Sequence, residues 1–248
     1  MAKDLTYRGR RVAAALLGLF AFALVVFLNP NSWELISSLR GEVQKPADIP
    51  FKDETTPDSM LAKDVLESLA VQEKNTTEKY YRKLFYDAWS ITSSGCNMRE
   101  AILSRDLKNV VFKGCKVQSG TLEDPYTGKT ITFTRGQETS EAVQIDHVVA
   151  LSNAWSTGAY ELDEATRYEI SQDPLNLIAV DGPANKEKSD QDASTWLPSN
   201  QGFQCQYVAR QISVKAKYHL WVTPAEKSAM QTVLANCPDE PTVGLENP

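Results

Sequence analysis

The sequence predicts an exported domain of mixed α+β class that follows an apolar N-terminal helix and is stapled by disulfides. Short runs of strand-forming residues alternate with stretches of helical apolar spacing along most of the chain. An uncharged apolar run lies near the N-terminus, and the four cysteines form an even set. The chain has 248 residues, of which 42% are hydrophobic and 23% charged. This composition excludes disordered, collagen-like and multi-spanning membrane classes.

Residues 1–28 have the pattern of a targeting segment. Val12 to Leu28 contains no charged residue, and a basic cluster precedes it. The run is near the lower length limit for a membrane-spanning helix, and no small-residue cleavage pattern follows it. We therefore expect a signal anchor in the membrane, with a cleaved signal peptide as the alternative. Because positive residues stay in the cytoplasm, the remaining chain should lie outside it, either membrane-anchored or secreted.

The cysteine spacing agrees with export. Four cysteines in an exported chain indicate two disulfides, and three pairings exist. Proximity in sequence favours Cys96–Cys115 and Cys205–Cys237. A zinc site is disfavoured, because no two cysteines have the short spacing of zinc ligands and the chain has only two histidines.

The exported part divides into four segments. Residues 29–57 hold four prolines with scattered charge and are expected to form a linker. Residues 58–94 form a helical segment in which apolar spacing predicts two helices, the second through Tyr80 to Trp89. Residues 95–237 form the main domain, and residues 238–248 are a C-terminal tail.

The main domain is expected to mix strands and helices in order along the chain. A short helix over 98–107 precedes strands at 110–112, 115–117 and 130–133, the last two joined by a turn at 124–128. Strands at 142–145 and 176–180 come next, followed by a helix over 183–193 that tolerates proline in its first turn. Apolar spacing predicts two final helices over 204–219 and 224–236.

The chemistry-bearing residues surround the last two strands. Asp146 and His147 end the first strand, Asn176 begins the second, and Asn185 follows in the next helix. Asp146 and Asn185 are hard oxygen donors of the kind that bind Mg2+ or Mn2+. His147 is a suitable general base for a water nucleophile. Asp146 and His147 are adjacent on a strand and would point to opposite faces, so both can serve one site only if the strand ends or twists there. Asn176 is expected to hold the loop by hydrogen bonds to the backbone.

Several short motifs in residues 95–237 match one family in combination. They are Gly95-Cys96, Arg105-Asp106-Leu107, Asp124-Pro125-Tyr126-Thr127-Gly128, Ile145-Asp146-His147-Val148-Val149-Ala150-Leu151, Asp173-Pro174-Leu175-Asn176-Leu177, Asn185 with Lys188-Ser189-Asp190, Thr195-Trp196-Leu197-Pro198 and Tyr207-Val208-Ala209-Arg210-Gln211. This stretch resembles exported bacterial HNH, or ββα-metal, endonucleases that are related to the C-terminal domain of GmrSD-type restriction enzymes. Asparagine stands at 185 where the name-giving form has histidine.

The resemblance implies a fold, an activity and roles for residues. A ββα-metal motif would be embedded in the disulfide-stapled domain, with His147 as catalytic base and Asn176 structuring the loop. Asp146 and Asn185 would hold Mg2+ or Mn2+. The activity would be metal-dependent hydrolysis of phosphodiester bonds in DNA, or in RNA. Near this site, Lys186 and Lys188 are expected to contact phosphates, and we expect the same of Arg210.

One property of the sequence opposes this interpretation. The formal net charge is −6, and the exported part is more negative still, whereas nucleic-acid binders usually present a basic face. The alternative is a catalytically inactive cell-surface module that binds a ligand or has a structural role. The sequence indicates no protein partner under either interpretation; its expected partners are nucleic acid and, through the N-terminal helix, the membrane.

Overall fold

The computed structural model describes residues 59–246, apart from residues 87 and 137–139. All of these residues belong to one compact unit. The apolar run at 12–28 and the linker at 29–57 lie outside the described residues, so their predictions remain as stated. Within the part of the chain that is described, no helix is long and apolar enough to cross a membrane.

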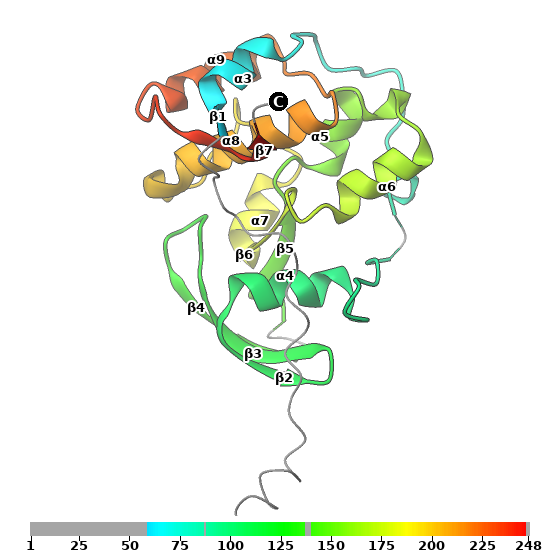
Figure 1. The fold of residues 1–248 in the computed structure, drawn as a ribbon, viewed down its shortest axis with the longest axis vertical. Helices are drawn as coiled ribbons and strands as arrows, with labels where there is room; N and C mark the ends of the chain where they lie inside the picture. The colour runs from blue at the N-terminus through cyan, green and yellow to red at the C-terminus, as the bar shows by residue number, and fades with distance from the viewer. Residues whose placement is uncertain (1–58, 87, 137–139, 247–248) are drawn as a thin grey trace, which may run out of the picture. The chain divides into compact units, whose positions relative to one another are not determined.

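The described chain is of mixed α+β class, as predicted, and contains three small antiparallel sheets (Figure 1). The largest joins β2 (Lys108–Lys113), β3 (Lys116–Glu123) and β4 (Thr130–Thr134). Helix α4 (Met98–Asp106) precedes this sheet and packs against β3. The turn at Asp124–Gly128 joins β3 to β4, as the sequence indicates.

A two-stranded ribbon lies at the centre of the domain and carries the predicted site. β5 (Val143–His147) pairs antiparallel with β6 (Leu177–Asp181), and the connection contains α5 (Leu151–Ser156), the turn η2 (Ala159–Glu161) and α6 (Glu164–Gln172). Helix α7 (Gly182–Lys188) follows β6 directly and contacts both strands, which gives the element order β, β, α.

The junction between β6 and α7 requires a glycine. A Cβ atom on Gly182 would lie 2.0 Å from the carbonyl oxygen of Glu141, a distance that no real contact allows. The Asp181 side chain caps the new helix by accepting a hydrogen bond from the amide of Ala184. Pro183 stands in the first turn, where its missing amide hydrogen is not needed. These three residues fix how α7 leaves the ribbon.

The C-terminal half covers one side of the ribbon. Helix α8 (Gln204–Lys217) follows the turn η3 (Gln201–Phe203) and packs against α9 (Pro224–Leu234) and α3 (Ala62–Ser68). The α9 start is a capping box, in which Thr223 and Glu226 exchange hydrogen bonds with each other's backbone amides. The apolar face of these helices meets Ile178 and Val180 of β6 in one buried cluster.

Both predicted disulfides are confirmed. Cys96–Cys115 links the start of α4 to the β2–β3 hairpin, and Cys205–Cys237 links the start of α8 to the chain after α9. The two bonds therefore close local units, which explains why proximity in sequence predicts them.

Three expectations about the elements differ from the structure. The prediction of a second helix in residues 58–94 is wrong. Within 80–89 the described residues form only the 3-10 turn η1 (Arg82–Leu84). The reason is that Phe85 is buried against Trp155, while Trp89 packs beside His147 of β5. The helix predicted over 183–193 ends at Lys188. The tail at 238–248 contains β7 (Pro241–Glu246), which pairs with β1 (Ser59–Leu61).

Candidate active site

His147 ends β5 beneath two aromatic rings. The residue is 6% exposed. The Trp89 indole lies nearly parallel to it, with an interplanar angle of 8° and ring centroids 6.0 Å apart, and the Tyr86 ring centroid lies 5.9 Å away. Both aromatic residues precede the predicted main domain in sequence. No local signal in the sequence predicts this contact, because both residues fall within the helix expected over Tyr80 to Trp89 and Trp89 belongs to its apolar face.

One ring nitrogen of His147 is held by the backbone. Nε2 lies 2.9 Å from the carbonyl oxygen of Ser171, at the end of α6. A carbonyl only accepts hydrogen bonds, so neutral His147 carries its proton on Nε2 and keeps the Nδ1 lone pair. Nδ1 forms no hydrogen bond to any described residue. Burial lowers the pKa of His147 to about 3, so the ring is neutral at pH 7. The geometry therefore presents Nδ1 as the basic nitrogen.

Asp146 points away from His147, to the other face of the ribbon, as alternation along a strand requires. Its Oδ2 accepts a hydrogen bond of 2.5 Å from the Tyr126 hydroxyl, and its Oδ1 lies 3.0 Å from Lys188 Nζ. Both Tyr126 and Lys188 are fully buried. Burial raises the pKa of Asp146, and the two partners oppose that rise. Asp146 thus forms a buried ion pair between β5 and α7.

Asn185 shares the Asp146 face but is engaged with a neighbouring strand residue. Its Nδ2 donates a hydrogen bond of 2.9 Å to Gln144 Oε1, two residues before Asp146 on β5. The structure therefore places Asp146 and Asn185 on one face of the ribbon and His147 on the other. It does not bring the three side chains together.

This arrangement does not fit a bound Mg2+ or Mn2+. The donor types are suitable, since both residues offer oxygen. However, the ammonium group of Lys188 already occupies the cation position against the Asp146 carboxylate. The one cluster of metal-type side chains among the described residues contains Cys205, Cys237 and Glu240, and its cysteines are joined in a disulfide.

Asn176 has the position that the sequence predicts for a loop-structuring residue. It is fully buried, and its Oδ1 accepts a hydrogen bond of 2.8 Å from the Val149 amide. Its Nδ2 donates to the carbonyl oxygens of Val149 and Ile170. These bonds tie the chain after β5 to the end of α6, next to the carbonyl group of Ser171 that holds His147.

The three residues expected to contact phosphates lie in different environments. Lys186 is exposed and pairs with Glu141 at 2.7 Å. Lys188 is fully buried against Asp146, and its Nζ also donates to the His147 carbonyl oxygen. Arg210 is 2% exposed, and its guanidinium donates to the carbonyl oxygen of Leu175. Burial therefore removes Lys188 and Arg210 from the surface that a polymer could reach.

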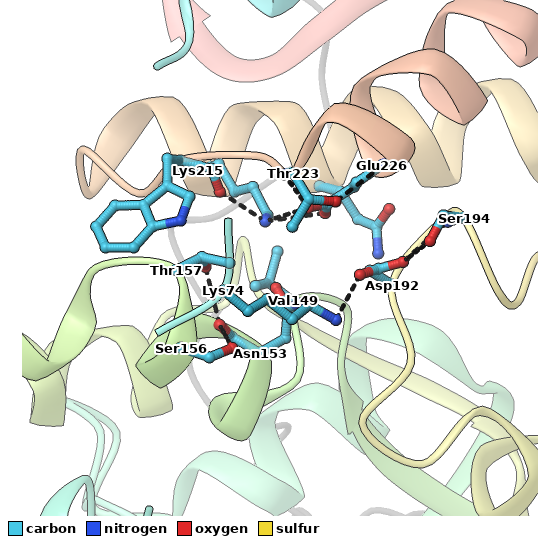
Figure 2. Close-up of polar contacts among 12 residues, drawn as sticks. Lys74, Val149, Asn153, Ser156, Thr157, Asp192, Ser194, Lys215, Thr223 and Glu226 are labelled. Atoms are coloured by element: carbon cyan, nitrogen blue, oxygen red, sulfur yellow. Dashed lines mark hydrogen bonds and ion pairs between the residues drawn. The ribbon is translucent and has the colours of Figure 1, made fainter. Parts of the chain in front are cut away.

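A second polar cluster lies at the start of α9 (Figure 2). Lys215 and Glu226 form a fully buried ion pair, with Nζ 2.8 Å from Oε1. Lys74 reaches in from the preceding segment and pairs with Asp192 at 2.6 Å. Lys215 belongs to α8, and Figure 2 shows its side chain turned toward Thr223 and Glu226. This cluster joins α8 to α9.

Comparison with known proteins identifies the family of this domain. Residues 92–233 match the family model described as GmrSD restriction endonucleases, C-terminal domain. The chain belongs to this family. The match confirms the resemblance that the sequence motifs indicate and supports a nuclease class in general.

The chain also has a relative that is described as secreted. An "uncharacterized secreted protein" from Arthroderma benhamiae is 38% identical over 195 residues, which cover 77% of this chain and 92% of the relative. No solved structure matches the chain. The aromatic residues Tyr86 and Trp89 precede the family match, so the His147 environment includes a part of the chain outside the GmrSD_C region.

Proposed function

We propose that this GmrSD_C domain is a nuclease that hydrolyses phosphodiester bonds, with DNA as the expected substrate and RNA as the alternative polymer. The observation that supports it most is the state of His147 in a chain of this family. The imidazole is neutral, its Nε2–H is held by the Ser171 carbonyl group, and Nδ1 keeps its lone pair. While it is buried, with a pKa of about 3, this histidine is a weak base. The proposal therefore requires that solvent reach the ring and return its pKa toward that of free histidine, where Nδ1 can act as a general base.

The proposed step uses the Nδ1 lone pair. Nδ1 takes a proton from a water molecule as the water oxygen attacks the phosphorus atom. The bond between phosphorus and the departing 3′ oxygen then breaks, and that oxygen takes a proton from solvent. Because His147 is only 6% exposed, access to Nδ1 requires neighbouring groups to move aside, and the Trp89 and Tyr86 rings are among the neighbours.

Dependence on Mg2+ or Mn2+ is a separate part of the proposal. It is supported by the family alone, because the Asp146 and Asn185 side chains as arranged do not fit a bound ion. The Lys188 ion pair stands against it, since the carboxylate is already neutralised. We therefore assign no step of the reaction to a metal ion.

We also propose that the domain acts outside the cytoplasm. The description of the relative as secreted and the two disulfides support this location. The basic and apolar pattern of residues 1–28 supports it independently. Anchoring through that segment, rather than release, remains the expectation from the sequence.

A second candidate is a catalytically inactive extracellular module. The buried Asp146–Lys188 pair and the covered His147 favour it, since neither group is open to a substrate in this arrangement. Plasmid nicking by the full chain, with Mg2+, with Mn2+ and with EDTA, separates the two. A nuclease converts supercoiled plasmid to open circles under at least one condition. An absence of cleavage of plasmid, single-stranded DNA and RNA under every condition supports the inactive module.

A further inference from the structure

Exposed cations and aromatic rings alternate in the segment that precedes the GmrSD_C match. Lys79, Arg82 and Lys83 are exposed, and Tyr81 among them is 47% exposed. Lys79 Nζ lies 5.1 Å from the centroid of the Tyr81 ring, and the Arg82 guanidinium lies 5.1 Å from that of the Tyr86 ring. We call Lys79, Tyr81, Arg82, Lys83 and Tyr86 the basic aromatic patch.

Among the described residues, the three cations of the basic aromatic patch have no partner in an ion pair. No carboxylate of a described residue lies within ion-pair distance of Lys79, Arg82 or Lys83. By contrast, Lys186 and Lys217 pair with Glu141 and Asp173. In a chain of net charge −6, residues 78–86 hold these three cations and one exposed carboxylate, Glu78, so this stretch is locally positive by +2.

The patch leads directly to the candidate base. Arg82 donates a hydrogen bond to the Tyr86 hydroxyl group, and the Tyr86 ring contacts the imidazole of His147. Arg82 is also close enough to His147 for its charge to lower the pKa of that histidine. Backbone contacts fix the segment on the domain, since the carbonyl oxygens of Glu78 and Leu84 accept hydrogen bonds from Trp155 and Arg167.

We infer that the basic aromatic patch is a docking surface for single-stranded nucleic acid, which it guides toward His147. Cations neutralise the phosphates of a strand, while exposed aromatic rings stack on its bases. Only an unpaired strand offers base faces to Tyr81, because a duplex hides them in its stack. The inference rests on the proposed function, and it assigns single strands as the substrate class.

The test measures binding without cleavage. A fluorescein-labelled 20-nucleotide single strand of mixed sequence is titrated with the full chain carrying His147→Asn, and fluorescence anisotropy is read at several salt concentrations. The patch variant carries Lys79→Gln, Arg82→Gln and Lys83→Gln. The control variant has the same change of charge at three exposed lysines in or next to the sheet of β2, β3 and β4, namely Lys113→Gln, Lys116→Gln and Lys129→Gln.

We expect the patch variant to bind at least about tenfold more weakly. Its salt dependence should also fall, by roughly two in log K against log[salt], because three phosphate contacts are lost. The control should bind as the parent does. Tyr81→Ala should weaken single-strand binding about fivefold or more and leave duplex binding unchanged. Two results would overturn the inference. One is an equal loss of single-strand affinity in both triple variants. The other is duplex binding as tight as single-strand binding, together with no change of affinity in Tyr81→Ala.

These outcomes are separable from the proposed function. Strong single-strand binding through the patch, in a protein whose unmodified form cleaves nothing, would retain the docking surface and reject the nuclease. Cleavage by the unmodified protein, with binding insensitive to the patch variant, would retain the nuclease and reject the docking surface. Circular dichroism of each variant checks that it is folded.

Discussion

The Trp89 indole lies nearly parallel to the buried His147 imidazole, with an interplanar angle of 8° and ring centroids 6.0 Å apart. The tryptophan comes from before the GmrSD_C match and the histidine from inside it. The candidate base of the family domain is thus sheltered by a neighbouring part of the same chain.

Removing the tryptophan ring should expose the histidine. In Trp89→Ala, we expect diethyl pyrocarbonate to modify His147 at least about tenfold faster than in the parent, because the parallel indole is gone. His219, the only other histidine, is exposed and serves as an internal reference that should react at the same rate in both proteins. Peptide mapping by mass spectrometry gives the two rates. An unchanged rate at His147 would show that Trp89 does not control access.

His147 should make the stability of the domain fall in mild acid. Its pKa is about 3 in the folded state and about 6.5 in an unfolded chain. Above pH 6.5 both states are neutral, so the group has no effect there. As the pH falls from 6.5 toward 3, the unfolded state binds the proton first, and the free energy of unfolding decreases. At about 1.4 kcal/mol per pKa unit, the full loss is roughly 4 to 5 kcal/mol.

Urea unfolding at pH 7, 5.5 and 4.5 measures this loss. The comparison is with His147→Gln, whose side-chain amide reaches as far as Nε2 and can still donate to the Ser171 carbonyl group but does not titrate. We expect the parent to lose more stability than the variant on going from pH 7 to 4.5. Parallel losses in the two proteins would place the acid sensitivity elsewhere.

Breaking the buried Asp146–Lys188 pair should destabilise the ribbon. Lys188→Met leaves the Asp146 carboxylate buried without its cation, which costs about 3 to 5 kcal/mol in the free energy of unfolding. Lys186→Met is the matched control on the same helix, since Lys186 pairs with Glu141 at the surface and should change stability little. Thermal and urea denaturation compare the two. Similar stability for both variants would contradict the assignment of Lys188 as an interior partner.

The sequence predicts local features of this fold well. The disulfides, the β3–β4 turn and the strands β5 and β6 follow from spacing and residue type, because each is determined within a few tens of residues. It also predicts that Asn176 holds the loop after β5, and the structure shows its hydrogen bonds to the Val149 backbone.

Contacts between distant segments are what the sequence does not predict. Tyr126 was interpreted only as part of a turn, yet its hydroxyl group binds the Asp146 carboxylate. The backbone carbonyl group of Ser171 holds His147, and a carbonyl group has no signature in sequence. The segment at 80–89 has apolar residues at helical spacing, but those residues bury themselves against separate parts of the domain. The expected meeting of Asp146, His147 and Asn185 fails because strand alternation keeps Asp146 and His147 on opposite faces.

The most direct test of the account is cleavage by a matched pair of histidine variants. Supercoiled plasmid and a labelled single strand are incubated with the unmodified chain, His147→Asn and His219→Asn; asparagine suits position 219, where the backbone has φ of 54°. We predict that His147→Asn loses at least about a hundredfold in rate, as expected when a general base is removed, while His219→Asn cleaves like the parent. Cleavage by His147→Asn at the parent rate would contradict the role of His147.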